Sequence, residues 1–240
     1  MRVPVVDLHA RVPGITEDLL AGALAEDGAD DPYRWLCSAL PPAGVVLDLC
    51  CGSARLADVV GAHRYLGVDR SEPELAVAAA RRPRARTRLG DALTAEPDGP
   101  IAAVALSMGL MLLPLPVVLH RAARWLGPGG VLAATVPLRD PTLTGTPYHR
   151  LLVALGWTGE PFPEPLDDLD RRCADAGFAV TSDELRWFAV PIVSADDRAL
   201  LLRSFYLPMT DLTAAGRLLA DLSAETAVLP YPIRRVVLTR

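Results

Sequence analysis

The chain has 240 residues, of which 51% are hydrophobic and 22% charged, and its formal net charge is -5. This composition supports a sizeable core and excludes a disordered or fibrous chain. The negative charge argues against a protein that wraps nucleic acid. The cysteines show no spacing typical of a zinc site, so we expect no metal and reduced thiols in a cytoplasmic protein. They are Cys37, Cys50, Cys51 and Cys173.

Two segments bear on membrane insertion. The first 14 residues contain Arg2, Asp7 and Arg11 and lack the apolar stretch of a signal peptide. Residues 101–119 are almost continuously apolar, but Pro114 interrupts them, and they divide into a strand, a loop and the start of a helix. We therefore expect no membrane-spanning segment.

The chain up to residue 137 predicts a helical cap followed by an alternating pattern. Within residues 1–42, helices are expected at 15–26 and 31–40. Residues 43–137 alternate apolar runs with helical segments, and residues 127–130 read as a tight turn. Ser71 and Glu74 predict a capping box. The expected strands are 45–49, 65–69, 87–89, 101–106 and 131–136, and the expected helices are 54–60, 71–80 and 117–126. Such alternation predicts a doubly wound α/β sheet with helices on both faces.

The regular alternation ends after residue 137. A Pro- and Thr-rich stretch occupies residues 137–165. The expected helices beyond it are 167–176, 195–205 and 212–222, and the expected strands are 178–190 and 233–238. We interpret the chain as one domain in which residues 43–137 form a regular α/β half and residues 138–240 form a second half with insertions.

Acidic residues follow three successive predicted strands. Asp48, Asp69 and Asp91 each stand where a strand ends, and a turn of small residues, 50–54, follows the first strand. In an open α/β sheet the ligand lies beyond the carboxyl ends of the strands. Taken singly, each acid also fits a structural role as a strand-end cap, a loop acid or a turn residue. Their joint placement favours a ligand site.

This pattern resembles the class I S-adenosylmethionine-dependent methyltransferases over roughly residues 40–137. The matching segments are 46–54, 68–69, 90–92 and 126–130. The resemblance implies a seven-stranded, mostly parallel sheet with an antiparallel last strand. It implies S-adenosylmethionine as cofactor and S-adenosylhomocysteine as product. The cofactor-binding residues it implies are Asp48, Leu49, Cys50, Cys51, Gly52, Ala54, Asp69, Arg70, Asp91, Ala92, Ser107 and Met108.

The resemblance also assigns a role to individual residues. Backbone amides near Gly52 would approach the methionine carboxylate at a helix N-terminus. Asp69 would accept hydrogen bonds from both ribose hydroxyls, and Asp91 would accept from the adenine amine. The backbone N–H of Ala92 would donate to the adenine ring. Asp48 would face the ammonium group of the ligand, directly or through water.

The turn departs from the G-x-G-x-G pattern of the family. Cys50 and Ala54 replace the first and third glycines, and the Cys-Cys-Gly-Ser turn looks like that of quinone-methylating members. We interpret Cys50 as a packed side chain and not a nucleophile. A nicotinamide-binding fold would need glycine where Arg55 stands, which disfavours a dehydrogenase.

Aromatic residues after position 137 favour a small, fairly apolar acceptor, for example a hydroxyl of a secondary metabolite or a quinone-like compound. They are Tyr148, Trp157, Phe162, Trp187, Phe188, Phe205 and Tyr206. The predicted catalytic residues are His149, as a base, and its neighbour Tyr148. We assign the remaining histidines, His9, His63 and His120, to surface or structural positions.

Two other classes of function remain open. The fold could bind the cofactor and act as a cyclase or an auxiliary partner subunit, and an RNA or protein methyltransferase is less favoured. We expect a small-molecule substrate, no nucleic acid or membrane partner, and a monomer or homodimer. The residues do not decide between O-, N- and C-methylation.

Overall fold

The computed structural model describes residues 9–25, 28, 30–138, 143–156, 168–205 and 212–240. Five of its strands are parallel neighbours in one sheet, in the order β6-β5-β2-β3-β4. Their bounds are β2 (Val46–Leu49), β3 (Tyr65–Asp69), β4 (Arg86–Leu89), β5 (Ile101–Ser107) and β6 (Leu126–Pro137). β2 is buried along its whole length, as expected for a central strand covered on both faces.

Three antiparallel pairings complete the sheet. β8 (Val228–Thr239) lies between β6 and β7 (Ala179–Pro191) and runs antiparallel to both. The predicted fold class is therefore confirmed, with the last strand antiparallel. An eighth, short strand, β1 (Leu24–Ala25), pairs with the edge of β7. A helix reaching residue 26 was expected there and is wrong, because pairing with β7 overrides the local helical pattern.

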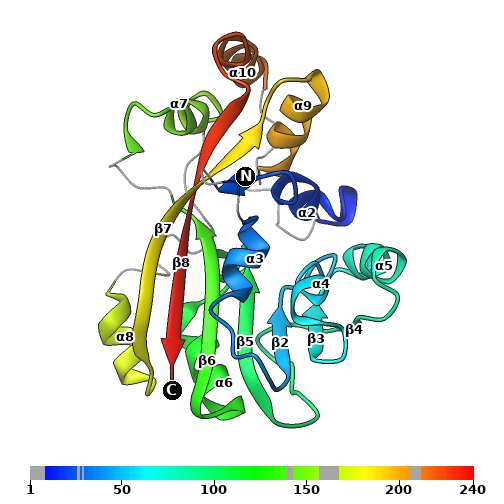
Figure 1. Cartoon of the computed structure of the whole chain (residues 1–240), viewed down its shortest axis with the longest axis vertical. Coiled ribbons are helices and arrows are strands. Elements are labelled where there is room, and N and C mark those ends of the chain that lie inside the picture. The colour runs from blue at the N-terminus through cyan, green and yellow to red at the C-terminus, as the bar shows by residue number, and fades with distance from the viewer. Residues whose placement is uncertain (1–8, 26–27, 29, 139–142, 157–167, 206–211) are drawn as a thin grey trace.

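Helices cover both faces of the sheet and gather at one end of its long strands (Figure 1). In that view β7 and β8 extend past the parallel strands, and α7, α9 and α10 pack around their upper ends. The helices are α2 (Ile15–Leu20), α3 (Pro32–Cys37), α4 (Ala57–Val60), α5 (Glu72–Arg81), α6 (Leu115–Trp125), α7 (Pro147–Ala154), α8 (Leu169–Asp175), α9 (Ala195–Ser204) and α10 (Thr213–Glu225).

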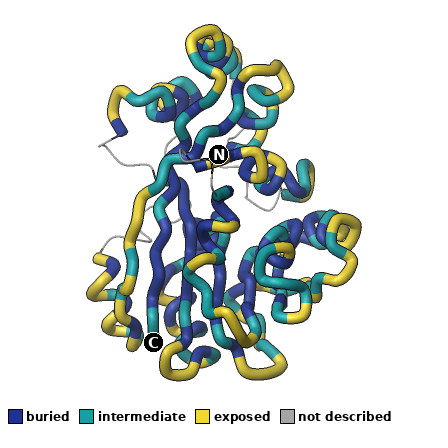
Figure 2. The backbone as a smooth tube through the Cα atoms, in the orientation of Figure 1, coloured by how far each residue is buried: buried dark blue, intermediate teal, exposed yellow. Residues whose placement is uncertain are grey.

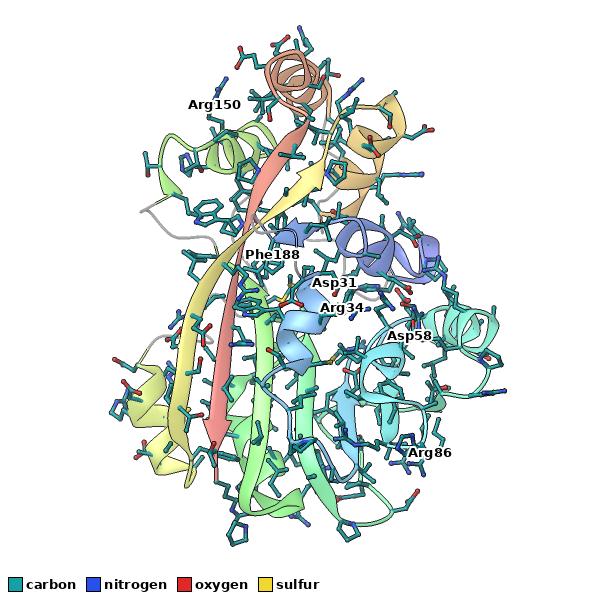
Figure 3. All side chains as sticks on the ribbon, viewed as in Figure 1. Asp31, Arg34, Asp58, Arg86, Arg150 and Phe188 are labelled. Atoms are coloured by element: carbon teal, nitrogen blue, oxygen red, sulfur yellow. The ribbon has the colours of Figure 1, made fainter. Side chains whose placement is uncertain are left out.

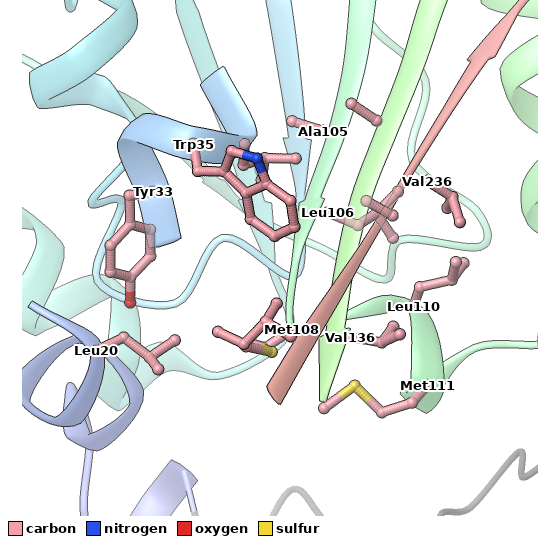
Figure 4. Packing of buried hydrophobic residues seen from close by; sticks show 14 of the residues in the cluster. Leu20, Tyr33, Trp35, Ala105, Leu106, Met108, Leu110, Met111, Val136 and Val236 are labelled. Atoms are coloured by element: carbon pink, nitrogen blue, oxygen red, sulfur yellow. The ribbon is translucent and has the colours of Figure 1, made fainter. Parts of the chain in front are cut away.

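The core follows the middle of the sheet, where Figure 2 shows the strands buried and the connecting loops exposed. Trp35 of α3 is 2% exposed and lies over the sheet beside Ala105 and Leu106 (Figure 4). Its ring also packs against Phe188 of β7, with centroids 5.6 Å apart. Trp35 thus connects α3 to the parallel strand β5 and to the antiparallel strand β7. Truncating a buried aromatic side chain of this kind costs about 3–5 kcal/mol of stability.

Two further expectations about local structure are wrong. Residues 126–130 belong to β6 and not to a tight turn, because Gly129 N–H donates to the carbonyl of Arg240 and Arg240 N–H donates to that of Gly130. α7 was not expected in the Pro- and Thr-rich stretch. Thr146 caps it by accepting from His149 N–H at 3.1 Å, and Pro147 occupies its first position. Because the stretch is rich in Pro and Thr throughout, Thr146 and Pro147 did not stand out in the sequence as the start of a helix.

Residues 101–119 divide as expected into β5, a short 3₁₀ helix at Leu110–Leu112 and the start of α6. Within the part of the chain that the structure describes, no helix combines the length and the apolar character needed to cross a bilayer.

Candidate functional site

Two adjoining cavities lie beyond the carboxyl ends of the parallel strands. The first is lined by residues of the β2–α4 turn, by Asp69 and by the N-terminal segment that includes Gly14 and Thr16. The second contains Asp91 and Ala92. The walls of both include Cys50, Asp69 and Arg70. The structure thus brings the three strand-end acids to one continuous region.

The turn after β2 holds three alternating residues in the left-handed backbone region. Their φ angles are 57° at Cys50, 50° at Gly52 and 62° at Ala54. These are the three positions where the G-x-G-x-G pattern places glycine. A side chain in this conformation costs about 1–2 kcal/mol, so Cys50 and Ala54 keep the turn at an energetic cost. The backbone shape of the motif survives without two of its glycines.

Asp69 is held by the backbone around it. Its Oδ2 accepts from Gly52 N–H and its Oδ1 from Ser71 N–H, both at 2.8 Å. Burial raises the pKa of this carboxyl above its usual range, and the two backbone hydrogen bonds oppose the rise. Each carboxylate oxygen keeps a second lone pair for a ligand. Asp69 is therefore oriented to accept from two neighbouring hydroxyls.

Asp48 is 2% exposed and lines the first cavity. Its Oδ2 accepts from the Tyr65 hydroxyl at 2.7 Å, whereas its Oδ1 is buried and has no partner among the described residues. Burial raises the pKa of this carboxyl to about 7 against the Tyr65 hydrogen bond, and Asp69 adds to the rise. A buried acceptor without a donor calls for a ligand or a water, and a cationic group fits it best.

Asp91 combines a structural role with a place in the second cavity. Its Oδ1 accepts from Leu93 N–H at 2.8 Å, which closes a local turn, and the side chain is exposed. The neighbouring Ala92 is buried in the cavity wall. Both the turn role and the ligand role considered for Asp91 are thus compatible with its position.

The other predicted cofactor residues divide into two groups. Arg70, Cys51, Ser107 and Met108 line the first cavity. Leu49 and Ala54, at 1% and 0% exposure, are core residues outside both linings. Leu49 and Ala54 can affect the site only by fixing the course of the backbone between β2 and α4.

The predicted catalytic pair lies elsewhere. Tyr148 is fully buried in α7, and its ring packs against Tyr231 with centroids 4.9 Å apart. His149 is half-buried on the same helix. Neither residue lines the two cavities, because α7 directs Tyr148 into the core against β8. This burial disfavours a place for Tyr148 at the methyl group, and the catalytic roles of Tyr148 and His149 stay predictions. Trp157, Phe162 and Tyr206 fall outside the described residues.

The N-terminal segment supplies site residues that the sequence did not reveal. His9, which was assigned to a surface or structural position, lines the first cavity and contacts the Glu74 carboxylate through Nδ1. Glu74 also accepts from Gly14 N–H at 2.9 Å. The predicted capping box is only half formed, because the Glu74 carboxylate binds this segment while Ser71 N–H donates to Asp69. The sequence singled out Glu74 as part of a capping box, but its partner His9 lies 65 residues away in the chain, so no local pattern indicated the contact.

Glu17 of α2 fastens the same segment to the turn. It accepts from Ser53 Oγ at 2.6 Å and from Arg81 and Arg82 at 2.9 Å. Burial acts to raise the pKa of Glu17, but these hydrogen bonds hold it at about 2. Arg55 extends the charged cluster to Asp58 at 2.7 Å and Asp31 at 3.5 Å; Figure 3 labels both acids. Ion pairs and hydrogen bonds of charged side chains therefore connect α2, the turn after β2 and α5 around the first cavity.

The site offers neither a reactive thiol nor a metal centre among the described residues. Burial raises the pKa of Cys50 and of Cys51, so both thiols are protonated at neutral pH. No group of three or more His, Cys, Asp or Glu side chains in the described ranges is arranged to hold a metal ion.

Comparison with known proteins points to one family. The family described as "Methyltransferase domain" matches residues 46–130, which span the turn and all three strand-end acids. These residues are similar in sequence to the class I methyltransferases. The [4+2]-cyclase SpnF shares the fold of the chain, with a TM-score of 0.58 and 17% identity over 96% of this chain and 92% of that one.

Two curated relatives are similar to part of the chain. Trans-aconitate 2-methyltransferase of Variovorax paradoxus (strain S110) is 34% identical over 55% of this chain and 51% of its own length. The 2-phytyl-1,4-naphtoquinone methyltransferase of Synechococcus elongatus is 41% identical over 40% of this chain and 46% of its own. The chain spans about half the length of the curated relatives it matches.

Proposed function

We propose that this protein is a methyltransferase that moves a methyl group from S-adenosylmethionine to a small, uncharged and largely apolar acceptor. The first part of the proposal rests on how well the residues fit the cofactor. The turn keeps the left-handed backbone of the glycine motif, Asp69 offers two oriented oxygens, and Asp48 offers a buried acceptor without a donor among the described residues. When bound, the cofactor supplies an electrophilic methyl carbon on a sulfonium.

The acceptor class rests on a third cavity that adjoins the first. Thr16 and Met108 line both, so the two spaces share a wall. The remaining described lining comes from Leu19, Leu20, Met111, Pro137, Ser204, Phe205 and Tyr231. Figure 4 shows Leu20, Met108 and Met111 among the buried hydrophobic residues of the core. This apolar lining, which among the described residues contains no charged side chain, is the observation that carries the proposal.

A charged acceptor would be disfavoured in this cavity. Burying an ionised group without a partner costs several kcal/mol, on the order of what separates a good substrate from an undetectable one. The hydroxyl of Thr16, which lines both the first and the third cavity, can orient a neutral polar group of the acceptor. The third cavity is small, at about 30 Å³, so it would receive one end of the acceptor. We infer that the uncharged end of a quinone-like or similar metabolite suits this cavity better than a carboxylate.

The described lining supplies positioning more than acid–base chemistry. Holding the acceptor atom in line with the methyl carbon and the sulfur supplies much of the rate of a methyl transfer. Tyr231 is the one titratable side chain in the described lining of the third cavity. The acceptor should therefore carry an atom that is nucleophilic while uncharged, such as an electron-rich carbon of a neutral enol or hydroquinone.

The test begins with S-adenosylhomocysteine binding, measured by calorimetry and thermal unfolding of the full chain, because a ligand that binds the folded state raises its stability. Transfer from labelled S-adenosylmethionine is then compared between neutral hydroxynaphthoquinones and trans-aconitate. We expect label in the neutral compounds alone. Faster transfer to trans-aconitate would overturn the acceptor class.

A matched pair of variants probes the third cavity. Phe205→Ala removes an apolar wall, and we expect the Michaelis constant of a neutral acceptor to rise about tenfold while cofactor affinity is unchanged. Val153→Ala, at an exposed position of α7, serves as control. Firm binding of S-adenosylhomocysteine without transfer to any acceptor would favour the second candidate, a cyclase or an auxiliary subunit.

A further inference from the structure

The buried pair formed by Asp48 and Tyr65 has a feature that the proposed function does not explain. Both side chains are nearly inaccessible, at 2% and 0% exposure, and one oxygen of Asp48 has no donor among the described residues. An ionised carboxylate in such a place is costly unless a cation or several donors face it. Tyr65 supplies a single donor, through its hydroxyl, to Oδ2.

The groups that face Asp48 do not include a cation. They come from β3 (Tyr65 and Asp69), from the turn (Cys50 and Cys51) and from α3 (Cys37), and all of them are neutral or negative. Arg55, which lines the same cavity, is paired with Asp31 and Asp58. The positive partner that would stabilise ionised Asp48 is thus absent from its described surroundings.

A second observation places a polar ligand group beside Asp48. In the sheet register, Asp48 stands opposite Ala105 of β5, so Ser107, two residues further, lies on the same face. Ser107 Oγ is buried, has no partner among the described residues, and belongs to the wall of the first cavity. Two unpartnered acceptors on one face of adjacent strands suit a group with several N–H donors.

We propose that Asp48 carries a proton in the empty site, that the ammonium group of the cofactor displaces this proton, and that Tyr65 is the positioning residue that sets the balance. This inference rests on the proposed cofactor. In the empty site the O–H bond of the acid satisfies the buried oxygen. On binding, that bond breaks, the proton leaves to solvent, and the carboxylate pairs with the ammonium group, which keeps its own protons.

The balance lies in the physiological range. Burial raises the pKa of Asp48 to about 7, with Tyr65 opposing and Asp69 adding to the rise. Below pH 7 the empty site therefore holds the proton and binding releases it, whereas above pH 7 there is little to release. Affinity should fall about tenfold between pH 8 and pH 6, because one pH unit below the pKa corresponds to about a tenfold change.

The experiment measures proton release on ligand binding by the full chain. Calorimetry of S-adenosylhomocysteine binding in two buffers with different ionisation enthalpies, at pH 6, 7 and 8, gives the number of protons released per site. We expect about one at pH 6 and almost none at pH 8. The matched ligand is 5′-methylthioadenosine, which lacks the amino-acid arm and should release no proton at Asp48. Both ligands carry the ribose that Asp69 is proposed to bind, so any proton exchange at Asp69 appears with both.

Two variants separate the role of Tyr65 from mere packing. Tyr65→Phe keeps the ring but removes the donor, so the midpoint of proton release should move upward by about one pH unit or more. Asp48→Asn should abolish the release while weaker binding persists, and it tests the proposal even if the Tyr65 variant does not fold.

The outcomes discriminate between the two proposals. Equal proton release with the two ligands, or none at pH 6 with firm S-adenosylhomocysteine binding, would overturn the inference and leave the proposed function intact. Failure of both ligands to bind at any pH would overturn the proposed function itself.

Discussion

Residues 43–137, proposed to bind the cofactor (the cofactor half), and residues 138–240, proposed to bind the acceptor (the substrate half), build their cavities in different ways. In residues 43–137 every predicted strand-end acid reaches a cavity, because parallel strands deliver their carboxyl ends to one edge of the sheet. In residues 138–240 the residues that reach a cavity, such as Phe205 and Tyr231, come from a helix end and an antiparallel strand. The comparison teaches that topology alone can place a site in the first half, whereas packing must do so in the second.

The largest expected effect is a loss of ligand binding in the cofactor half. Asp69→Ala removes both oriented oxygens, and two charge-assisted hydrogen bonds at about 1.5–3 kcal/mol each imply at least about a hundredfold weaker binding of S-adenosylhomocysteine. Calorimetry measures the dissociation constant. The control is Asp221→Ala on exposed α10, where binding should be unchanged. Equal losses in the two variants would contradict the placement of the ribose.

A second prediction concerns the energetic cost of the cofactor half. Asp48 is ionised in the unfolded chain above about pH 4, but in the folded state its pKa is raised to about 7. Between these values the folded state binds more protons, so its contribution to stability falls as pH rises and levels off above pH 7. Each pKa unit corresponds to about 1.4 kcal/mol, so Asp48→Asn should stabilise the empty protein at pH 8 by about 4 kcal/mol and by less at pH 5.

Urea unfolding of both proteins at the two pH values checks this prediction. Other titrating groups are common to the two proteins, so the difference isolates Asp48. A variant that is less stable than the parent at pH 8 would show that Asp48 stabilises the empty fold.

A smaller effect contrasts one glycine from each half. Gly52 has a φ of 50°, and a Cβ there would meet Glu74 Oε2 only at an ordinary 3.5 Å, so backbone strain dominates. Gly52→Ala should cost about 1 kcal/mol. Gly216 lies within α10, where an added Cβ would meet Leu202 Cδ1 at an ordinary 4.0 Å, and Gly216→Ala should stabilise by about 0.5–1 kcal/mol. Opposite shifts in the unfolding midpoint are expected. Shifts of the same sign would contradict the left-handed turn.

The smallest expected effect concerns His149. As a general base it would lower turnover about a hundredfold on replacement by alanine, with cofactor affinity unchanged. Its position on α7, outside the three cavity linings, predicts instead a change of about twofold at most in kcat. Steady-state kinetics with a neutral acceptor decides between these values.

Local residue patterns determined the cofactor half of this protein. Strand and helix periodicity located β2, β3, β5 and α5, and the positions of Asp48, Asp69 and Asp91 followed from the rule that parallel strands end at one edge. The small residues at 50–54 indicated a turn after the first strand, and its left-handed backbone was seen only in the structure. These features depend on neighbours within a few residues or on a general property of parallel sheets, so a single sequence can reveal them.

Only the tertiary structure decided the remainder. The pairing of β1 with β7, the contact of His9 with Glu74 and the burial of Tyr148 against Tyr231 join residues more than 60 positions apart. Each partner has an ordinary local role, such as helix cap or surface side chain, that its neighbours in sequence also support. Which role it takes depends on the packing of distant segments, and no local pattern encodes that choice.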